Sequence, residues 1–464
     1  MNEKKLQKLT AIITGLMSRY KVPGLSITIT EKGVTTLNQG FGARNLERNE
    51  PATPQTLFNI GSVTKSFTAM AMMQLVERGA ISLDDPVSSF LDIPLFSGHP
   101  DITIEHILSH SSGIPSLDGS VFPLAIRFGS YRNVIPLTSK GDFLRYLSGA
   151  VEESIFSPGK KFFYNNDMYT CAGFIIEDIT GKAVQDYIRE EILEPLGMER
   201  AVCTRERFEA DPLNNRLTGY LTSEKDGKAL LAVGELPFYE HLCAPGGLYC
   251  STEELSRYAR CLTGRGELDG KRILSPEGIG ELWSPRIATP YGEGADPSYC
   301  LGWVREDDFY GTTLMHHAGS IGVSSAFLAV LPESGVTIAV AENDGLTIAS
   351  AVGRSAAALV LGAEPAGAVK ALRRNEIIEL IQGSYYTYAE TYSMHITFEE
   401  GVLFAEIETD DGASKFPIIP EGGNELSFQT GHYIPAKREG ITFLTDGNGR
   451  IRHATFDRYL FHRK

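Results

Sequence analysis

Hydrophobic and polar positions at the start of the chain predict one helix followed by a β-hairpin. Between residues 3 and 20 the apolar residues recur at the spacing of one helix face, and Pro23-Gly24 ends the pattern. Residues 25–30 alternate between apolar and polar, residues 34–37 form a second strand-like run, and the turn Glu31-Lys32-Gly33 separates the two. We therefore expect an amphipathic helix and then an antiparallel hairpin.

The middle of the chain is predicted to be mainly helical. Residues 68–78 contain no Pro or Gly and Gly79 supplies a stop, so we expect a buried helix that starts close to Ser62. Apolar periodicity predicts further helices over these ranges: 102–108, 143–147, 169–180, 184–193 and 252–262. Residues 115–141 are rich in Gly, Pro and Ser, and we expect a long ordered excursion that forms a wall or lid over a site. An aromatic segment around Tyr164 reads as strand-like.

Strand patterns return after the helical middle. They cover residues 312–319, 325–331 and 336–341, and an Ala-rich helix follows over 346–361. Strands from both ends of this region can share one antiparallel sheet, with the helical part inserted between them. The predicted class is α/β (α+β), an antiparallel sheet flanked by helices with an all-helical insert.

The C-terminal part of the chain has a different texture. Short alternating segments, among them residues 402–407 and 432–436, are separated by Gly or Asn turns, which predicts a small antiparallel barrel or sandwich. The predicted domains are residues 1–362, a linker over 363–373, and a β-barrel domain over 374–464.

Composition limits the classes of partner. The chain has 464 residues, 42% of them hydrophobic, and a formal net charge of −15. That charge argues against nucleic acid and against an anionic membrane surface as partners. The first ten residues carry charges with no apolar run behind them, so we expect no signal peptide and a cytoplasmic protein. The six cysteines, like the histidines and carboxylates, lack the spacing of metal ligands; we expect reduced structural thiols, no metal and no cofactor.

Candidate chemistry centres on Ser62 and Lys65. Residues three apart share one helix face, so the Ser62 hydroxyl and the Lys65 amine can meet at the first turn of the predicted helix. An apolar setting disfavours the charged amine, and a neutral Lys65 can take the proton of Ser62 and make it a nucleophile. A Ser-x-x-Lys tetrapeptide is common by chance, and alone it is better explained as an N-cap serine beside a solvated lysine.

Two further signals follow in order along the chain. Tyr164-x-Asn166 lies in the helical middle, and His317-x-Gly319 lies on a predicted strand, followed by Ser320. Taken singly, an aromatic Tyr is usually core packing. A strand His is more often a hydrogen-bonded structural residue, as we expect for His316 on the opposite face of the strand. His110 is better explained as a structural cap than as a catalyst, because no triad acid is evident near it.

The ordered set of motifs resembles the serine beta-lactamase and penicillin-binding-protein superfamily, in particular its class C-like esterase and D-aminopeptidase branch. The stretches Leu108–Ile114, Pro195–Met198, Ala244–Leu248 and Leu301–Trp303 are also similar to stretches of that branch, and the resemblance covers residues 8–362. Any one motif is weak, but the ordered set is specific.

The resemblance implies an acyl-enzyme mechanism with a Ser-Lys-Tyr centre. Ser62 attacks a carbonyl, and Lys65 and Tyr164 handle the proton, Tyr164 as phenolate or relay. By the same analogy Gly319 lies at the site, and the backbone amides of Ser62 and Ser320 form the oxyanion hole. Asn166 binds Lys65 and the substrate amide.

Two departures from the family pattern change the expected substrate. The third motif reads His317-Ala-Gly where penicillin-recognising members carry Lys-Thr-Gly, and histidine near pH 7 is only partly a cation. Efficient beta-lactam hydrolysis is therefore not expected, and His317 is expected to orient Tyr164 or the substrate. The middle motif is Tyr-Asn-Asn, whose central side chain we expect to have no role.

The predicted function is hydrolysis of a small peptide, amide or ester, with a leaning to a peptidase that accepts D-amino acid residues. A carboxylesterase or weak beta-lactamase, and a non-catalytic scaffold or binding protein of the same fold, stay as alternatives. The C-terminal segment resembles the lipocalin-like domain of some peptidases of this branch. The resemblance implies a domain that shapes the active-site cleft or binds a neighbouring subunit, so a homo-oligomer is one option. A small-ligand module and a stabilising appendage are the others.

Overall fold

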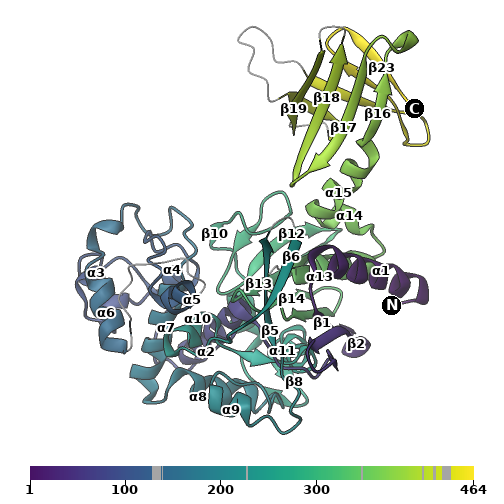
Figure 1. Ribbon diagram of the computed structural model, residues 1–464. Helices are drawn as coiled ribbons and strands as arrows, with labels where there is room; N and C mark the ends of the chain where they lie inside the picture. The colour runs from purple at the N-terminus through teal and green to yellow at the C-terminus, as the bar shows by residue number, and fades with distance from the viewer. Residues whose placement is uncertain are drawn as a thin grey trace. The chain divides into compact units, whose positions relative to one another are not determined.

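The computed structural model describes residues 1–127, 137, 139–225, 228–345, 348–409, 412–421, 425–430 and 440–464. The chain divides into two units, Met1–Ala368 and Val369–Lys464 (Figure 1).

A nine-stranded antiparallel sheet is the frame of the first unit. N-terminal strands and C-terminal strands share it, since β1 pairs with β15 at Ile27↔Val340. This confirms the predicted sheet built from both ends of the region. The order across the sheet is β10 (Ile287–Ala288), β11 (Ser298–Tyr299), β12 (Val304–Phe309), β13 (Thr312–Ser320), β14 (Ser325–Leu331), β15 (Val336–Glu342), β1 (Gly24–Glu31), β2 (Val34–Asn45) and β3 (Glu50–Pro51).

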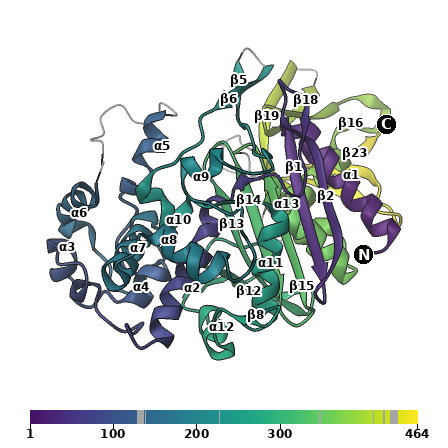
Figure 2. The ribbon, with the colours of Figure 1, turned by 90° about the horizontal axis from the view of Figure 1, so that it is seen from below.

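Helices cover both faces of this sheet because its central strands β1, β14 and β15 are buried on both sides. Figure 2 shows α1 (Glu3–Tyr20) and α13 (Ile348–Leu361) together on one side of the strands and α11 (Thr252–Thr263) on the other. On the first side Phe327 of β14 packs against Gly353 of α13. On the second, the Thr28 hydroxyl donates a 3.0 Å hydrogen bond to the Thr252 hydroxyl. All seven residues of β14 and of β15 are buried as a result.

The helical part lies between β3 and β10 in sequence, as predicted. It begins with η1 (Gly61–Val63) and α2 (Thr64–Glu77). Its other helices are η2 (Val87–Ser89), α3 (Pro94–Ser97), α4 (Ile104–Leu108), η3 (Gly119–Val121), α5 (Phe122–Arg127), α6 (Lys140–Ser148), η4 (Val151–Glu153), α7 (Asn166–Thr180), α8 (Val184–Ile188), the π-helical η5 (Arg189–Leu193), α9 (Arg205–Glu209), η6 (Glu240–Leu242), α10 (Cys243–Gly246) and α12 (Pro276–Leu282). Three two-stranded ladders accompany them: β4 (Phe58–Asn59) with β7 (Tyr249–Cys250), β5 (Gly219–Lys225) with β6 (Lys228–Gly234), and β8 (Glu267–Leu268) with β9 (Lys271–Arg272).

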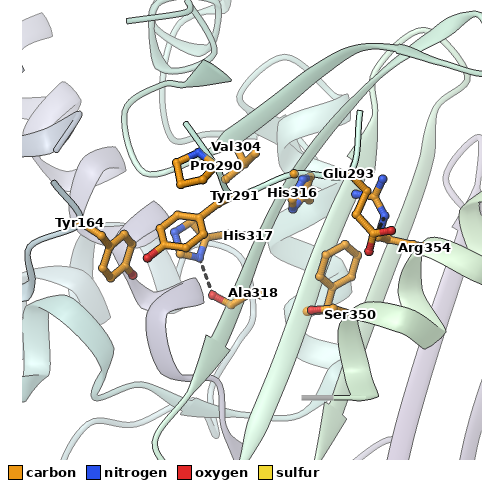
Figure 3. Close-up of a pocket in the computed structure, with 12 residues that line it drawn as sticks. Tyr164, Pro290, Tyr291, Glu293, Val304, His316, His317, Ala318, Ser350 and Arg354 are labelled. Atoms are coloured by element: carbon orange, nitrogen blue, oxygen red, sulfur yellow. Dashed lines mark hydrogen bonds and ion pairs between the residues drawn. The ribbon is translucent and has the colours of Figure 1, made fainter. Parts of the chain in front are cut away.

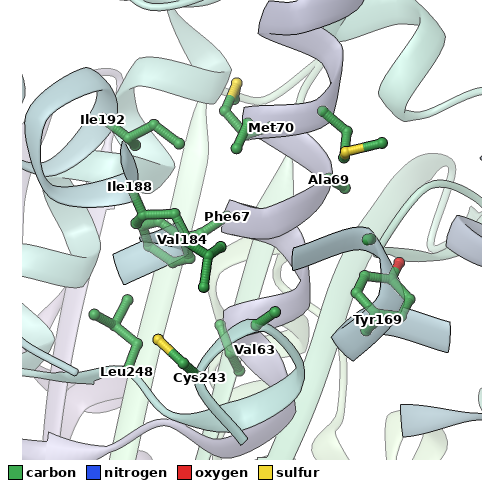
Figure 4. Close-up of a cluster of buried hydrophobic side chains, with 14 of the residues drawn as sticks. Val63, Phe67, Ala69, Met70, Tyr169, Val184, Ile188, Ile192, Cys243 and Leu248 are labelled. Carbon is green, nitrogen blue, oxygen red and sulfur yellow. The ribbon is translucent and has the colours of Figure 1, made fainter. Parts of the chain in front are cut away.

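Helix α2 runs through the centre of the core (Figure 4). Every residue from Thr64 to Leu75 is buried, the polar residues Lys65 and Thr68 included. Phe67 stacks on Tyr258 of α11 with ring centroids 3.9 Å apart. Other parts of the core therefore pack against α2 on all sides, and the side chains at its start are held in fixed positions.

The second unit is a closed eight-stranded antiparallel barrel, which decides between the predicted barrel and sandwich. Strand β16 pairs with both β17 and β23 and so closes it. Its strands are β16 (Gly383–Tyr386), β17 (Ser393–Glu399), β18 (Val402–Thr409), β19 (Gly412–Pro420), β20 (Ser427–Thr430), β21 (Gly440–Thr445), β22 (Ile451–Phe456) and β23 (Tyr459–Arg463), with η7 (Tyr388–Glu390) between the first two. Apolar side chains such as Phe416, Phe428, Phe443 and Phe461 form its core. The strand predicted over 432–436 lies outside the described residues.

Three local predictions differ from the structure. The segment predicted as a linker, 363–373, contains α14 (Pro365–Ala368) and the start of α15 (Lys370–Ile381). The aromatic segment before α7 is not a strand, because Tyr164 lies on irregular backbone. Within the predicted excursion 115–141 the structure has η3, α5 and the start of α6, while residues 128–136 and 138 lie outside the described part. Among the described residues, no helix has the length and apolar character needed to cross a bilayer.

Candidate active site

Ser62 and Lys65 meet where the chain enters α2. Ser62 lies in the 3-10 turn η1, and Lys65 lies in the first turn of α2. The Lys65 Nζ atom is 3.0 Å from the Ser62 Oγ atom. The structure thus brings together the two residues that the helical spacing pairs.

Lys65 has two further partners, and in both cases an oxygen atom accepts the hydrogen bond. Its Nζ donates to Asn166 Oδ1 over 2.7 Å and to the carbonyl oxygen of Pro245 over 2.8 Å. A neutral amine has two N–H donors and one lone pair. With both N–H groups bound to these acceptors, the lone pair of a neutral Lys65 faces Ser62 Oγ.

The surroundings of Lys65 favour that neutral form. Its side chain is fully buried. Burial lowers the pKa of the Lys65 ammonium well below its ordinary value, and the carboxylate of Asp167 opposes part of the shift. The Nζ atom also lies 4.7 Å from the ring centroid of Tyr164 and 5.4 Å from that of Tyr169. The amine is therefore enclosed by rings and by neutral acceptors.

Tyr164 and Asn166 are brought to Lys65 by the start of α7. Asn165 is the N-cap of this helix, and its side chain accepts from the amides of Asp167 and Met168. Asn165 Nδ2 also donates to the carbonyl of Pro115 over 2.8 Å. The central residue of the motif, for which we expected no role, therefore fixes the turn that carries its two neighbours.

Burial raises the pKa of the Tyr164 phenol, and a hydrogen bond with Ser62 opposes part of that shift. The phenolate is thus disfavoured near neutral pH. Of the two expected forms, phenolate or relay, the electrostatics favour a protonated Tyr164 that relays a proton.

His110 holds the segment that carries Tyr164 through hydrogen bonds and a ring contact. It lies in the left-handed backbone region, with φ of 59°. Its Nδ1 accepts from the amide of Asn165 over 3.1 Å, and its carbonyl accepts from the amide of Phe163. Its ring packs 4.3 Å from the ring of Tyr164. These contacts are those of a structural residue, as predicted from the sequence.

His317 faces the site from β13 and is held as a neutral ring. Its Nδ1 lies 2.6 Å from the carbonyl oxygen of Ala318, and its Nε2 lies 3.0 Å from the Tyr299 hydroxyl (Figure 3). A carbonyl accepts only, so Nδ1 carries the proton and Nε2 accepts from Tyr299. Burial, followed by the charge of Lys65, lowers the pKa of His317 to about 3.

Two expectations for His317 change as a result. It is not a partial cation near pH 7, because its pKa lies far below that value. We also expected His317 to orient Tyr164 or the substrate. Its hydrogen bonds go instead to Tyr299 and Ala318, and its ring centroid lies 6.3 Å from that of Tyr164. Neighbouring His316 points to the other face of the sheet, as predicted, where Nε2 lies 2.9 Å from Glu306 Oε1.

Gly319 lets β13 lie directly against η1. A Cβ atom on Gly319 would lie 2.6 Å from the backbone nitrogen of Ser62. A Cβ atom on Gly61, whose φ is +50°, would lie 2.4 Å from the nitrogen of Ser320. Because Gly61 and Gly319 have no side chains, β13 and η1 can lie in direct backbone contact. The backbone amides of Ser62 and Ser320 lie on the two sides of this contact.

The structure thus gathers all seven residues expected at the site: Ser62, Lys65, Tyr164, Asn166, His317, Gly319 and Ser320. Sequence reasoning missed the roles of Asn165, Pro245 and Tyr299. An Asn directly before a predicted helix is a capping signal that would have identified Asn165. A backbone carbonyl such as that of Pro245 leaves no trace in residue type.

Comparisons with known proteins match both parts of the chain. The Beta-lactamase family model matches residues 9–363, and a model described as the Pab87 octamerisation domain matches residues 365–462. A solved structure of the octameric penicillin-binding protein homologue from Pyrococcus abyssi is 32% identical, with a TM-score of 0.85 over 98% of this chain and 99% of that chain.

Two of the curated relatives match 73% of this chain each. The unguisins hydrolase ungD' of Aspergillus campestris is 28% identical over 348 residues, which are 73% of this chain and 61% of that protein. Protein flp of Staphylococcus aureus strain MW2 is 26% identical over 349 residues, 73% of this chain and 63% of that protein. The match therefore spans less than two thirds of the length of either relative.

Proposed function

The chain belongs to the beta-lactamase family, and from this premise we propose that it is a serine hydrolase that acts on small peptides or amides through an acyl-enzyme on Ser62. One observation carries the proposal. The buried Lys65 amine donates to Asn166 and to the Pro245 carbonyl, so the lone pair of its neutral form faces the Ser62 hydroxyl at 3.0 Å. This is the arrangement of a general base next to its nucleophile.

The first half of the reaction forms an ester. Ser62 Oγ attacks the substrate carbonyl while its proton passes to Lys65 Nζ. The oxyanion that forms accepts hydrogen bonds from the backbone amides of Ser62 and Ser320, which the Gly61–Gly319 contact brings together. Collapse of the intermediate breaks the C–N bond. The leaving amine takes a proton from the Tyr164 hydroxyl, and the protonated Lys65 returns one to Tyr164, so the acyl-enzyme is left with a neutral Lys65.

The second half hydrolyses the ester. Water attacks the acyl carbon, and its proton passes through Tyr164 to Lys65. The Ser62 oxygen leaves and takes a proton back from Lys65, so the site ends in its starting state. Because the pKa of Tyr164 is raised by burial, Tyr164 serves as a relay and Lys65 holds the proton.

The substrate class follows from the third motif. A neutral His317 supplies no fixed cation, in contrast to the ammonium of Lys-Thr-Gly proteins, so a beta-lactam carboxylate gains little there. We therefore favour peptides and amides, including those with D-amino acid residues on the acyl side. The resemblance to the D-aminopeptidase branch supports this choice, and one relative is named as a hydrolase of unguisins.

The experiment is turnover of a chromogenic panel by the full chain and by Ser62→Ala. The panel contains a nitrophenyl acetate, L- and D-alanine nitroanilides, a longer D-residue peptide and a chromogenic cephalosporin. We expect Ser62-dependent release from the D-residue amides. Release from the acetate alone would move the assignment to an esterase. Absence of both turnover and labelling of Ser62 by a reactive phosphonate would refute the enzyme and leave a scaffold.

We also propose that the chain forms a homo-oligomer through its second unit. Residues 365–462 match an octamerisation domain model, and the Pyrococcus abyssi homologue that covers 98% of this chain is described as octameric. Apolar side chains exposed on this unit, Tyr388 at 88% and Ile419 at 58%, fit a surface that another copy covers. Sedimentation of the full chain at several concentrations measures the mass, and a monomer at all of them would refute the assembly.

A further inference from the structure

A cavity of about 380 Å³ opens beside the candidate active site, and the mechanism above makes no use of it. Its lining comes from both faces of the sheet and from the loop before β11 (Figure 3). Its lining includes Tyr164, Tyr291, Glu293, His316, His317 and Arg354.

The cavity passes around the edge of β13. Pairing of β12 with β13 ends at Val304↔His316, so Ala318 lies beyond the end of β12. His317 points to the face with the catalytic residues, whereas His316 packs near Phe327 on the face with α13. A substrate group that enters beside Tyr164 therefore reaches Arg354 of α13 by passing Ala318.

One end of the cavity is the proton-relay residue Tyr164, whose ring meets that of Tyr291 edge-on at 5.3 Å. In the proposed function Tyr164 protonates the leaving amine. This inference rests on that function: the cavity then lies on the leaving-group side of the scissile bond.

The other end holds a buried ion pair. Arg354 donates from Nη1 and Nη2 to the two carboxylate oxygens of Glu306 over 2.6 and 3.0 Å, and from Nε to the Ala368 carbonyl over 2.8 Å. Glu306 also accepts from His316 and from the amide of Gly294. Burial lowers the pKa of His316, so it is a neutral donor. The charge of Arg354 is therefore already matched by Glu306.

Glu293 adds a second carboxylate to this end. Its Oε1 lies 3.8 Å from Arg354 Nε, and its side chain is 30% exposed. Two carboxylates and one guanidinium carry a net charge of one negative unit. The walls between Tyr164 and this end are mainly apolar and include Val304, Ala318 and Phe327. An apolar passage that leads to net negative charge suits a long aliphatic side chain with a cationic tip.

We propose that this cavity is a subsite for the leaving residue of the substrate, selective for a basic side chain whose ammonium or guanidinium group is bound by Glu293.

The test compares peptides that differ only in the leaving residue: lysine, its uncharged near-isostere norleucine, and glutamate. Release of the free amine is measured for the full chain, for Glu293→Gln, and for the control Glu47→Gln, which removes an exposed carboxylate on a different surface. We expect lysine to exceed norleucine in kcat/KM by about tenfold, the ratio that one charge-assisted hydrogen bond supplies. Glu293→Gln should remove this preference, Glu293→Lys should turn it toward glutamate, and Glu47→Gln should retain it.

A second measurement does not depend on peptide turnover. Lysine amide and norleucine amide compete with a reactive phosphonate for Ser62, and the slowing of labelling reports their binding. We expect protection by lysine amide that Glu293→Gln abolishes. Equal protection by both amides, or a lysine preference that survives in Glu293→Gln, overturns the subsite while labelling of Ser62 still supports the hydrolase. Absence of labelling in the unmutated chain overturns the proposed function and the subsite with it.

Discussion

The hydroxyl of Tyr299 lies 3.0 Å from Nε2 of His317 and holds that ring in one tautomer. The opposite nitrogen, Nδ1, donates to the carbonyl of Ala318 over 2.6 Å. Tyr299 and His317 are both buried, the histidine at 4% exposure, so neither exchanges its partner for water freely. A residue two positions before the Leu301-Gly-Trp303 stretch thus sets the state of the third motif.

Replacement of Tyr299 by Phe should lower kcat about tenfold and change KM little. The substitution keeps the ring but leaves Nε2 of a buried imidazole without its donor, which costs about 1–3 kcal/mol. His317 then loses its fixed orientation beside the reacting groups. Steady-state kinetics on the best substrate of the panel measures the effect. Tyr388→Phe, at a side chain 88% exposed, is the control. A pure rise in KM would contradict a positioning role.

The acidic limb of the pH profile should report Lys65. Lys65 acts as a base only when neutral, so kcat/KM should be high above the pKa of Lys65 in the folded protein and should fall as the pH drops through it. This pKa lies well below that of free lysine. The Asp167 carboxylate raises the pKa of Lys65. Asp167→Asn should therefore move the acidic limb to lower pH.

The pH at which the acidic limb falls distinguishes a change in the pKa of Lys65 from damage to the fold in Asp167→Asn. Asp167 also accepts hydrogen bonds from the amide and the hydroxyl of Ser120, each 2.7 Å long, so loss of these bonds lowers activity at every pH without moving the limb. A uniform loss at every pH with the limb unmoved would show a structural role alone. Asp92→Asn, at an exposed aspartate, serves as the matched control.

Gly319→Ala should abolish activity and labelling of Ser62 while the second unit is unaffected. A methyl group there would lie 2.1 Å from the Ile60 carbonyl oxygen and 2.6 Å from the Ser62 nitrogen, both backbone atoms. Strand β13 must then move away from η1, which separates the two amides beside Ser62. Gly15→Ala is the control, because its Cβ would meet nothing within 4 Å and alanine favours helix α1 by roughly 1 kcal/mol. Retained labelling in Gly319→Ala would refute the oxyanion geometry.

Acid should destabilise the first unit through Glu306. Burial alone would raise the pKa of this carboxyl, but hydrogen bonds from His316 and Arg354 outweigh it and lower the pKa well below 4.5. A depressed folded pKa contributes stability that is fully present above the unfolded pKa and is lost as the pH falls below it. The Tm of the unmutated chain should therefore drop as the pH falls below about 4.3, the ordinary pKa of a glutamate.

Glu306→Gln tests that assignment by calorimetry at neutral and acidic pH. At neutral pH the free energy of unfolding should fall by about 3–5 kcal/mol, since the substitution removes the carboxylate that binds both Nη atoms of the buried Arg354 and leaves only Glu293, 3.8 Å from Nε. Its Tm should then change less with acid than that of the unmutated chain or of Glu47→Gln. An equal fall in all three would assign the acid sensitivity to other groups.

Much of the fold could be predicted from local pattern. The apolar spacing of one helix face predicts α1. Alternating or apolar runs predict the hairpin of β1 and β2 and the strands β14 and β15. Where backbone contacts decided the outcome, local pattern failed. The aromatic residues around Tyr164 are typical of a strand, yet the N-cap of Asn165 and the hydrogen bonds to His110 hold that segment as irregular backbone.

The sequence alone determined that the side chains of Ser62 and Lys65 lie together. Ser62 and Lys65 are three residues apart on one helix, and that spacing places their functional atoms together wherever the helix is buried. Only the tertiary structure decided their chemistry. The Pro245 carbonyl and Asn166 set the direction of the Lys65 lone pair. Burial keeps His317 neutral, and Tyr299 fixes the tautomer of its ring. Protonation depends on burial and on partners distant in sequence, and neither is encoded in the identity or spacing of the residues themselves.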